Sequence, residues 1–85
     1  MKKRILKYPV HAVQATEMPL DAEIVKFDFQ NSTPTVWAVT VDSEKCGLRK
    51  LRVVATGQAV PLRWKYIDTA FDGPFVWHLY LEPWD

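Results

Sequence analysis

Hydrophobic and polar residues alternate with a period of two in several short stretches of this 85-residue chain. Val25, Phe27 and Phe29, for example, are separated by charged residues. Successive side chains of a β-strand point to opposite faces of a sheet, so this pattern predicts strands with one apolar face. Seven such strands are predicted between glycine, proline and other turn residues, at residues 4–8, 13–18, 22–30, 36–41, 49–56, 64–71 and 75–82.

These short strands predict an all-β fold, a small and mainly antiparallel domain of five to seven strands. We expect a curled sheet, a sandwich or a partial barrel. A chain of 85 residues has room for a single domain, which we place at residues 1–85. Its composition, 48% hydrophobic and 13% aromatic, is more apolar than one thin sheet needs, so a partner surface is expected.

The dipeptide Asp72-Gly73 between the last two strands is the strongest hairpin signal in the chain. A two-residue type I′ turn at this dipeptide would place Phe71 opposite Pro74 and Trp77 opposite Asp68. Gly73 would then adopt the positive φ that such a turn requires.

Assigning one face of every strand to the interior gives a candidate core and a second face. The predicted core residues are Val25, Phe27, Phe29, Trp37, Val39, Leu51, Val53, Phe75, Trp77 and Leu79. The second face carries Val36, Ala38, Val54, Ile67, Phe71, Val76 and Tyr80. Large apolar patches are rarely left bare, so we expect the N-terminal segment around Ile5, Leu6 and Tyr8, or another copy of the chain, to cover this face. The prediction is a homo-oligomer, most simply a two-fold dimer.

Charge and cysteine content narrow the class of protein. The formal net charge of +1 gives no global field for nucleic acid or for an anionic membrane, so neither is an expected partner. The lone Cys46 cannot form an internal disulfide, which favours a reducing compartment. The basic start of the chain is followed by no long apolar run, so we predict neither a signal peptide nor a membrane span. The expected location is the cytoplasm.

No residue pattern in the chain is typical of catalysis, of a metal site or of a bound cofactor. His78 lies mid-strand among apolar neighbours, and it is either a partly buried histidine bound to an acceptor or a ligand contact. Asp68 is placed on the apolar face, where it acts either as a structural hydrogen-bond acceptor or as a proton-donating acid. We therefore predict a protein that is not an enzyme and has no cofactor and no metal.

Basic and aromatic residues along two neighbouring segments form the one candidate binding surface. They are Lys50, Arg52, Arg63, Trp64, Lys65 and His78. Guanidinium groups and aromatic faces together suit stacking on bases and holding phosphates. The small net charge favours a small anionic, nucleotide-like ligand or an acidic protein patch over extended nucleic acid. The alternative interpretation is a solvated charged face whose aromatic residues belong to the core.

Several stretches of the chain carry a family resemblance, and Pro19, Gln30, Trp37-Ala38, Thr56-Gly57 and Trp77-His78 are its clearest marks. The stretches are residues 5–8, 16–19, 22–25, 29–31, 36–39, 51–57, 66–69 and 73–80. In this order and spacing they resemble a family of small proteins of unknown function that are encoded mainly by bacteriophages and prophages. The resemblance covers nearly the whole chain. It implies a viral setting and a compact accessory protein in the cytoplasm of the bacterial host. Gln58 departs from it, because many relatives are expected to have histidine there.

Three functions are compatible with these observations and with the resemblance. The first hypothesis is a non-catalytic phage accessory protein that binds a host protein and antagonises a host defence or another host factor. The second is an oligomeric binder that sequesters a small anionic, nucleotide-like ligand on the basic and aromatic surface. The third is an accessory part of the virion or of its assembly.

Overall fold

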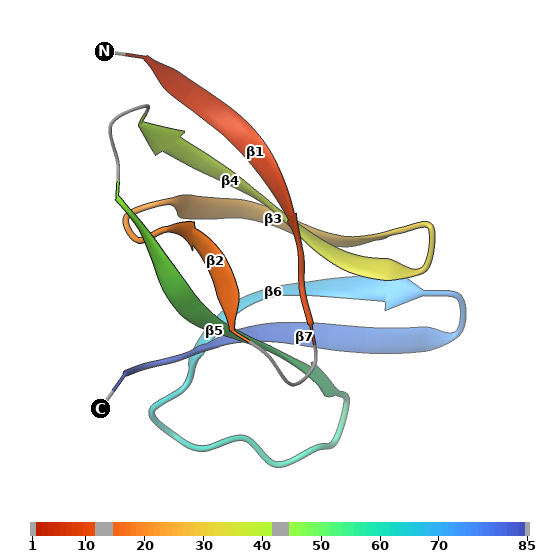
Figure 1. Cartoon of the computed structure of the whole chain (residues 1–85). Helices are drawn as coiled ribbons and strands as arrows, with labels where there is room; N and C mark the ends of the chain where they lie inside the picture. Colours follow the sequence, from red (N-terminus) through yellow and green to blue (C-terminus); the bar gives the residue numbers. More distant parts are fainter. Residues whose placement is uncertain (1, 12–14, 42–44, 85) are drawn as a thin grey trace.

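The described residues form seven antiparallel strands in two sheets, which confirms the all-β fold that the alternating pattern predicted (Figure 1). The computed structural model describes residues 2–11, 15–41 and 45–84, and these ranges contain no helix. The strands are β1 (Lys3–Pro9), β2 (Thr16–Pro19), β3 (Glu23–Gln30), β4 (Thr33–Val41), β5 (Cys46–Ala55), β6 (Lys65–Asp72) and β7 (Phe75–Glu82). Val13 and Gln14 of the second predicted strand lie outside the described residues.

The strands are divided between a three-stranded sheet, in the order β1-β4-β3, and a four-stranded sheet, in the order β2-β5-β7-β6. Neither sheet closes into a barrel. The edge strands β3 and β6 run alongside each other, so the two sheets meet along this line (Figure 1). The core lies between the sheets, where each of them contributes one face.

A two-residue turn at Asn31 and Ser32 fixes the β3–β4 hairpin, and both residues have positive φ, 52° and 65°. This is the φ pattern of a type I′ turn. Gln30 therefore pairs with Thr33, and Phe27 comes to lie opposite Val36. Cross-strand partners share a face of the sheet.

The hairpin register decides which face of β4 is buried. Val36 and Ala38 are fully buried, whereas Trp37 and Val39 are only partly buried. The prediction that Trp37 and Val39 form the core was therefore wrong by one residue. An even-numbered turn pairs odd positions of β3 with even positions of β4, and this reverses the faces assigned from the sequence.

A β-bulge explains the second error in the predicted core. The β3–β4 register shifts between Ile24 and Lys26, which leaves Val25 as the extra residue without a partner. Val25 is accordingly 50% exposed, although the alternation assigned it to the interior. Ile24 packs against the core in its place.

The remaining core residues show where the alternation was informative. The buried hydrophobic residues are Val10, Met18, Ala22, Phe27, Val36, Ala38, Leu51, Val54, Ala70 and Leu79. Phe27, Leu51 and Leu79 confirm the prediction, and Phe29, Val53 and Trp77 pack against this cluster while partly buried.

The β6–β7 hairpin forms, but its turn is one residue later than predicted. Asp72 pairs with Phe75, so the two turn residues are Gly73 and Pro74. Gly73 has φ of 59°, and the ring of Pro74 holds φ near −65°, which together fit a type II′ turn and exclude type I′. The predicted pairing of Trp77 with Asp68 was wrong by two residues, because Trp77 faces Ala70. Phe75, at the tip, is 60% exposed rather than buried.

The N-terminal segment does not cover the outer face of the four-stranded sheet. β1 instead pairs edge-on with β4, from Lys3 opposite Val41 to Pro9 opposite Thr35. Ile5 and Leu6 remain open to solvent, with Ile5 63% exposed, whereas Tyr8 packs against the core. For the outer face of the four-stranded sheet, the prediction that the N-terminal segment covers it is therefore wrong.

Candidate binding site

Three of the predicted surface residues share the outer face of the four-stranded sheet. In the β5–β7 pairing, Arg52 lies opposite Tyr80 and Val54 lies opposite His78. Lys50 lies two residues before Arg52, on the same face, opposite Glu82. The structure thus brings Lys50, Arg52 and His78 onto one surface, as the sequence indicated.

Glu82 neutralises much of the positive charge on this surface. Its Oε1 accepts a hydrogen bond of 2.9 Å from Arg52 Nε, and its Oε2 lies 3.7 Å from Lys50 Nζ. Lys50 Nζ also lies 4.2 Å from the ring centroid of Trp84, within range of a cation–π contact. The sequence analysis missed both partners. Arg52 Nη1 is buried and has no hydrogen-bond partner.

His78 lies in the middle of a hydrogen-bonded chain of side chains from β6, β7 and the turn that follows β5. Its Nε2 lies 2.8 Å from Thr56 Oγ1, and its Nδ1 lies 2.9 Å from Thr69 Oγ1. Thr69 Oγ1 is in turn 2.6 Å from the hydroxyl of Tyr66. A neutral imidazole has one donor and one acceptor, and hydroxyls can serve as either. Both ring nitrogens are therefore engaged, which corresponds to the structural interpretation of this histidine.

The other predicted surface residues lie apart from this face. Arg63 is exposed and Trp64 partly buried in the loop that leads to β6. Lys65, the first residue of β6, pairs with Leu81, whereas the next residue, Tyr66, pairs with Tyr80 on the outer face. Because side chains alternate along a strand, Lys65 is on the opposite face from Lys50 and Arg52.

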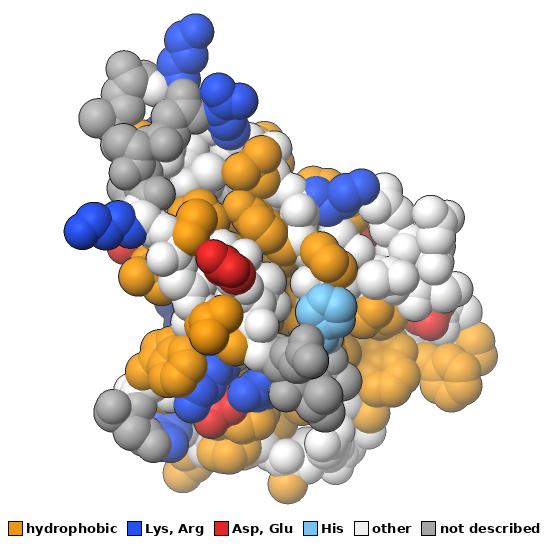
Figure 2. Space-filling model, in the orientation of Figure 1, with side chains coloured by type: hydrophobic (Ala, Val, Ile, Leu, Met, Phe, Trp, Pro, Cys, Tyr) orange, Lys and Arg blue, Asp and Glu red, His pale blue; other side chains and the backbone are white. Residues whose placement is uncertain are grey.

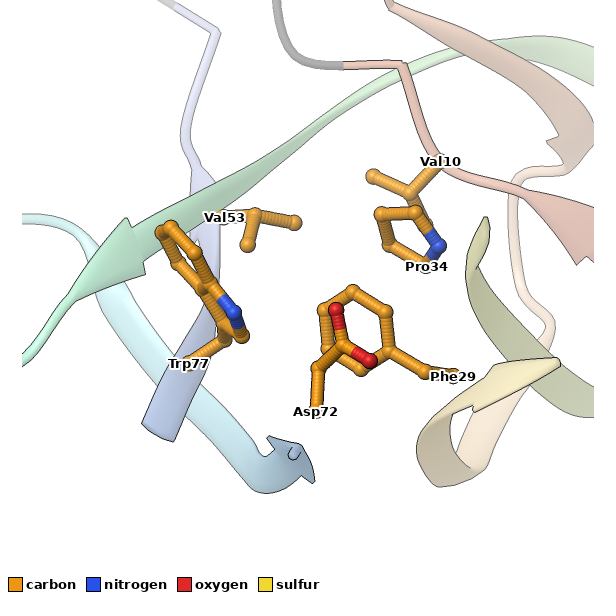
Figure 3. A pocket seen from close by; sticks show the side chains of 6 residues that line it. All are labelled: Val10, Phe29, Pro34, Val53, Asp72 and Trp77. Atoms are coloured by element: carbon orange, nitrogen blue, oxygen red, sulfur yellow. The ribbon is translucent and has the colours of Figure 1, made fainter. Parts of the chain in front are cut away.

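A cleft of about 220 Å³ opens between the two sheets. Its lining residues come from both sheets and are Val10, Phe29, Pro34, Val53, Asp72 and Trp77. In Figure 3, Val53 and Trp77 lie on one side of the cleft, and Val10, Pro34 and Phe29 lie on the other. Asp72 supplies the single charged group, so the cleft has apolar walls and one carboxylate.

Two exposed phenylalanines lie at the tip of the β6–β7 hairpin, Phe75 on the same face as the cleft and Phe71, opposite Val76, on the outer face. Phe71 is 67% exposed and Phe75 is 60% exposed. The ring of Phe75 lies 6.4 Å from that of Trp77, so it extends the aromatic wall outward. Figure 2 shows hydrophobic side chains gathered at the lower right, where β6 and β7 turn. Exposed aromatic residues beside a concave surface are typical of a binding site.

A second groove lies where β1 and β2 approach each other, on the side opposite the β3–β6 contact. It has a volume of about 440 Å³ and is lined in part by Tyr8, Thr40 and Cys46. Partial burial, and then the charge of Cys46, raise the pKa of Tyr8 above its usual value. Both effects favour the neutral form of the phenol.

Among residues 2–11, 15–41 and 45–84 no group of three or more histidine, cysteine or acidic side chains is arranged to hold a metal ion. The same residues include no helix with the length and hydrophobicity that a membrane span requires.

The fold and the cleft together define a small two-sheet, all-β domain with an aromatic-walled concave surface. The chain belongs to a family described as a domain of unknown function, DUF7352, whose family model matches residues 1–84. This confirms that the chain belongs to a family of unknown function, as the sequence resemblance implied. A search of curated proteins found no match, and a search of solved structures found none.

The sequence analysis missed the cleft as a site, although one signal pointed to it. Asp72 precedes Gly73-Pro74, and an aspartate before a tight turn normally accepts a hydrogen bond from the N–H two residues later. Pro74 has no N–H, so this carboxylate is left available for another partner.

Proposed function

We propose that the protein acts by binding another protein and that it catalyses no reaction. The observation that carries this proposal is the apolar cleft between the sheets, which the exposed Phe75 extends outward, together with the exposed Phe71 on the other face of the same hairpin tip. Aromatic residues are enriched in the cores of protein interfaces, and a few of them supply most of the binding energy. Their exposure at a hairpin tip supports a contact surface for a partner.

The proposed setting is the cytoplasm of a bacterium infected by a phage that encodes this protein. The bound partner is a host protein, and binding antagonises a host defence or another host factor. The support for this setting is the resemblance given by the stretches around Pro19, Trp37-Ala38 and Trp77-His78. The apolar contact surface is compatible with it, because an antagonist needs a binding surface and no catalytic group.

Affinity capture with matched variants tests the contact surface. The tagged protein is used to capture partners from lysate of infected host cells, alongside the double variant Phe71→Ser, Phe75→Ser. Both phenylalanines are exposed, so the double variant keeps its fold within about 0.5 kcal/mol per site. We expect a specific host protein to be captured by the parent and lost from the double variant.

The matched control is Leu62→Ser, which removes a fully exposed apolar side chain from the loop between β5 and β6. It is expected to capture the same host protein as the parent. Capture that survives in the double variant, or is lost equally in the control, contradicts the assignment of the hairpin tip.

A second candidate function is favoured by one observation on the outer face. The buried Nη1 of Arg52 donates to no partner, and Lys50 and Trp84 lie on the same surface. A small rearrangement of Glu82 would expose a guanidinium, an ammonium and an aromatic ring to a nucleotide-like anion. This corresponds to the ligand-sequestering hypothesis.

Thermal unfolding with a panel of nucleotides separates the two candidates. A ligand at 100 times its Kd stabilises the folded protein by about 2.7 kcal/mol, which raises Tm by several degrees for a domain of this size. The shift should disappear in Arg52→Gln and persist in Lys65→Gln, since Lys65 is on the other face. A flat response to mono-, di- and cyclic nucleotides removes the second candidate and leaves the first intact.

A further inference from the structure

The carboxylate of Asp72 is the one charged group at the cleft between the sheets. It forms no hydrogen bond and no ion pair with another residue that the structure describes. The turn that follows does not use it either, because Pro74 offers no N–H. An ionised carboxylate against apolar walls is costly to desolvate unless a cation accompanies it. The cleft therefore selects for a positive charge.

The walls of the cleft suit a cation that also carries apolar surface. Phe29 and Trp77 present aromatic rings on the two sides, and the Asp72 carboxyl group is seen against the Phe29 ring in the view of Figure 3. Cations bind to aromatic faces, and the planar, weakly hydrated guanidinium group stacks on them better than an ammonium does. Guanidinium also matches a carboxylate with two parallel hydrogen bonds.

The size and the remaining polar atom of the cleft point to a side chain rather than a larger molecule. Its volume of about 220 Å³ is below the ~300–1,000 Å³ typical of pockets for drug-sized ligands. The indole nitrogen of Trp77 lies on the cleft side of the ring in Figure 3, and it has no hydrogen bond to a described residue. A peptide carbonyl of a bound partner is its natural acceptor.

We propose that the cleft binds an arginine side chain of the partner protein, with the guanidinium paired to Asp72 and held between Phe29 and Trp77. The inference rests on the proposed function, since it names the chemistry of the partner's contact residue. The exposed Phe75, whose ring adjoins that of Trp77, packs against the aliphatic part of the same segment. Phe75 and the cleft are then one continuous contact surface.

The test uses the free protein and small probes, so it is independent of any captured host partner. The ¹⁵N-labelled protein is titrated with N-acetylarginine methylamide while the indole N–H resonances are recorded. The resonance of Trp77 is identified by its absence from the spectrum of Trp77→Phe. We expect that resonance to shift with a saturable curve. N-acetylcitrulline methylamide, the neutral isostere, should bind at least tenfold more weakly.

Two variants test whether binding of the arginine probe depends on the charge of Asp72. Asp72→Asn should weaken binding of the arginine probe at least tenfold, whereas Glu17→Gln, which removes an exposed carboxylate from β2, should leave it unchanged. Equal binding of the arginine and citrulline probes, an unchanged affinity in Asp72→Asn, or no saturation overturns the proposal. Tighter binding of spermidine than of the arginine probe overturns the assignment to a protein side chain. None of these outcomes decides the proposed protein-binding function, which the capture experiment with the Phe71 and Phe75 double variant tests separately.

Discussion

Two aspartates on one face of β6 have different roles because different groups lie opposite them. Asp68 Oδ2 accepts a hydrogen bond of 2.9 Å from the backbone N–H of Phe27 in β3, and its Oδ1 accepts one of 2.8 Å from Thr69 N. It thereby joins the two sheets where they meet. The sequence analysis expected a structural acceptor as one of two alternatives for Asp68. Asp72, four residues later, has no such donor and faces the cleft.

The first prediction compares these two aspartates. Asp68→Ala should reduce the free energy of unfolding by about 1–3 kcal/mol, because the buried N–H of Phe27 loses its acceptor. Asp72→Ala should change it by no more than about 0.5 kcal/mol. Urea titrations followed by tryptophan fluorescence measure both values. Equal effects of the two substitutions would show that the Asp68 bond does not stabilise the contact between the sheets.

At the scale of elements, tight turns and bulges determine which side chains are buried. The β3–β4 and β6–β7 hairpins both have two-residue turns, and each contains a bulge, at Val25 and at Ile67. Each bulge reverses the faces of the strand beyond it. The two bulged strands, β3 and β6, are also the two that run side by side between the sheets. The bulges therefore lie on the two edge strands along which the sheets meet.

The turn at Gly73 should be sensitive to substitution although the site is open. No atom lies within 4 Å of the position that a Cβ would occupy, so the cost of Gly73→Val comes from the positive φ alone. We expect a loss of about 1–3 kcal/mol in the free energy of unfolding. The control is Thr33→Val, which places valine directly after the other tight turn, at the first residue of β4. Its backbone is extended, so this change should be nearly neutral. Chemical denaturation of both variants provides the comparison, and a neutral Gly73→Val would argue against this turn geometry.

The buried face of β4 is tested by substituting neighbouring valines. Val36 is fully buried, so Val36→Ala should cost about 2 kcal/mol of stability through lost burial and the cavity that remains. Val39, which is partly buried, should lose less than half as much on the same change. Thermal and urea unfolding of the pair decide the matter. A larger loss of stability for Val39→Ala than for Val36→Ala would instead support the buried face that the sequence alternation assigned.

These elements also show how much the sequence could predict. The all-β class, the short antiparallel strands and the presence of the last hairpin follow from local alternation and turn residues, and the structure confirms them, although the turn of that hairpin lies one residue later. The buried face of β4 depends on a turn length and a bulge, and a single residue such as Val25 carries no local signal for a bulge. The cleft depends on two sheets meeting, so residues as distant as Val10 and Trp77 come together only through long-range pairing.

At the scale of the whole molecule, apolar surface remains that no part of the described chain covers. Tyr66 and Phe71 are exposed on β6, and β1 carries Ile5 and Leu6 at the edge of the other sheet. Because β1 does not cover the outer face of the four-stranded sheet, only one of the two covers expected from the sequence remains. A second copy of the chain as the cover stays a prediction.

The corresponding prediction is a homo-oligomer, most simply a dimer with a two-fold axis. Sedimentation velocity at micromolar concentration should give a species of about twice the 9.9 kDa of the chain. Tyr66→Ser, on the outer face of β6, should shift the protein towards the monomer, and Leu62→Ser should not. A single 9.9 kDa species at these concentrations would contradict the prediction.

The order of pairing along the chain has a consequence for how fast the protein folds. The hairpins β3–β4 and β6–β7 close over two residues, whereas β1 and β2 pair with strands that lie much later in sequence. Loop closure makes such pairing slow, so β1 and β2 should join after the rate-limiting step. Stopped-flow kinetics of Met18→Ala, in β2, should then show faster unfolding and an unchanged folding rate. Leu79→Ala, equally buried but in β7, should slow folding. Because β2 pairs late, a newly made chain would spend the first part of its lifetime with β2 not yet paired to β5.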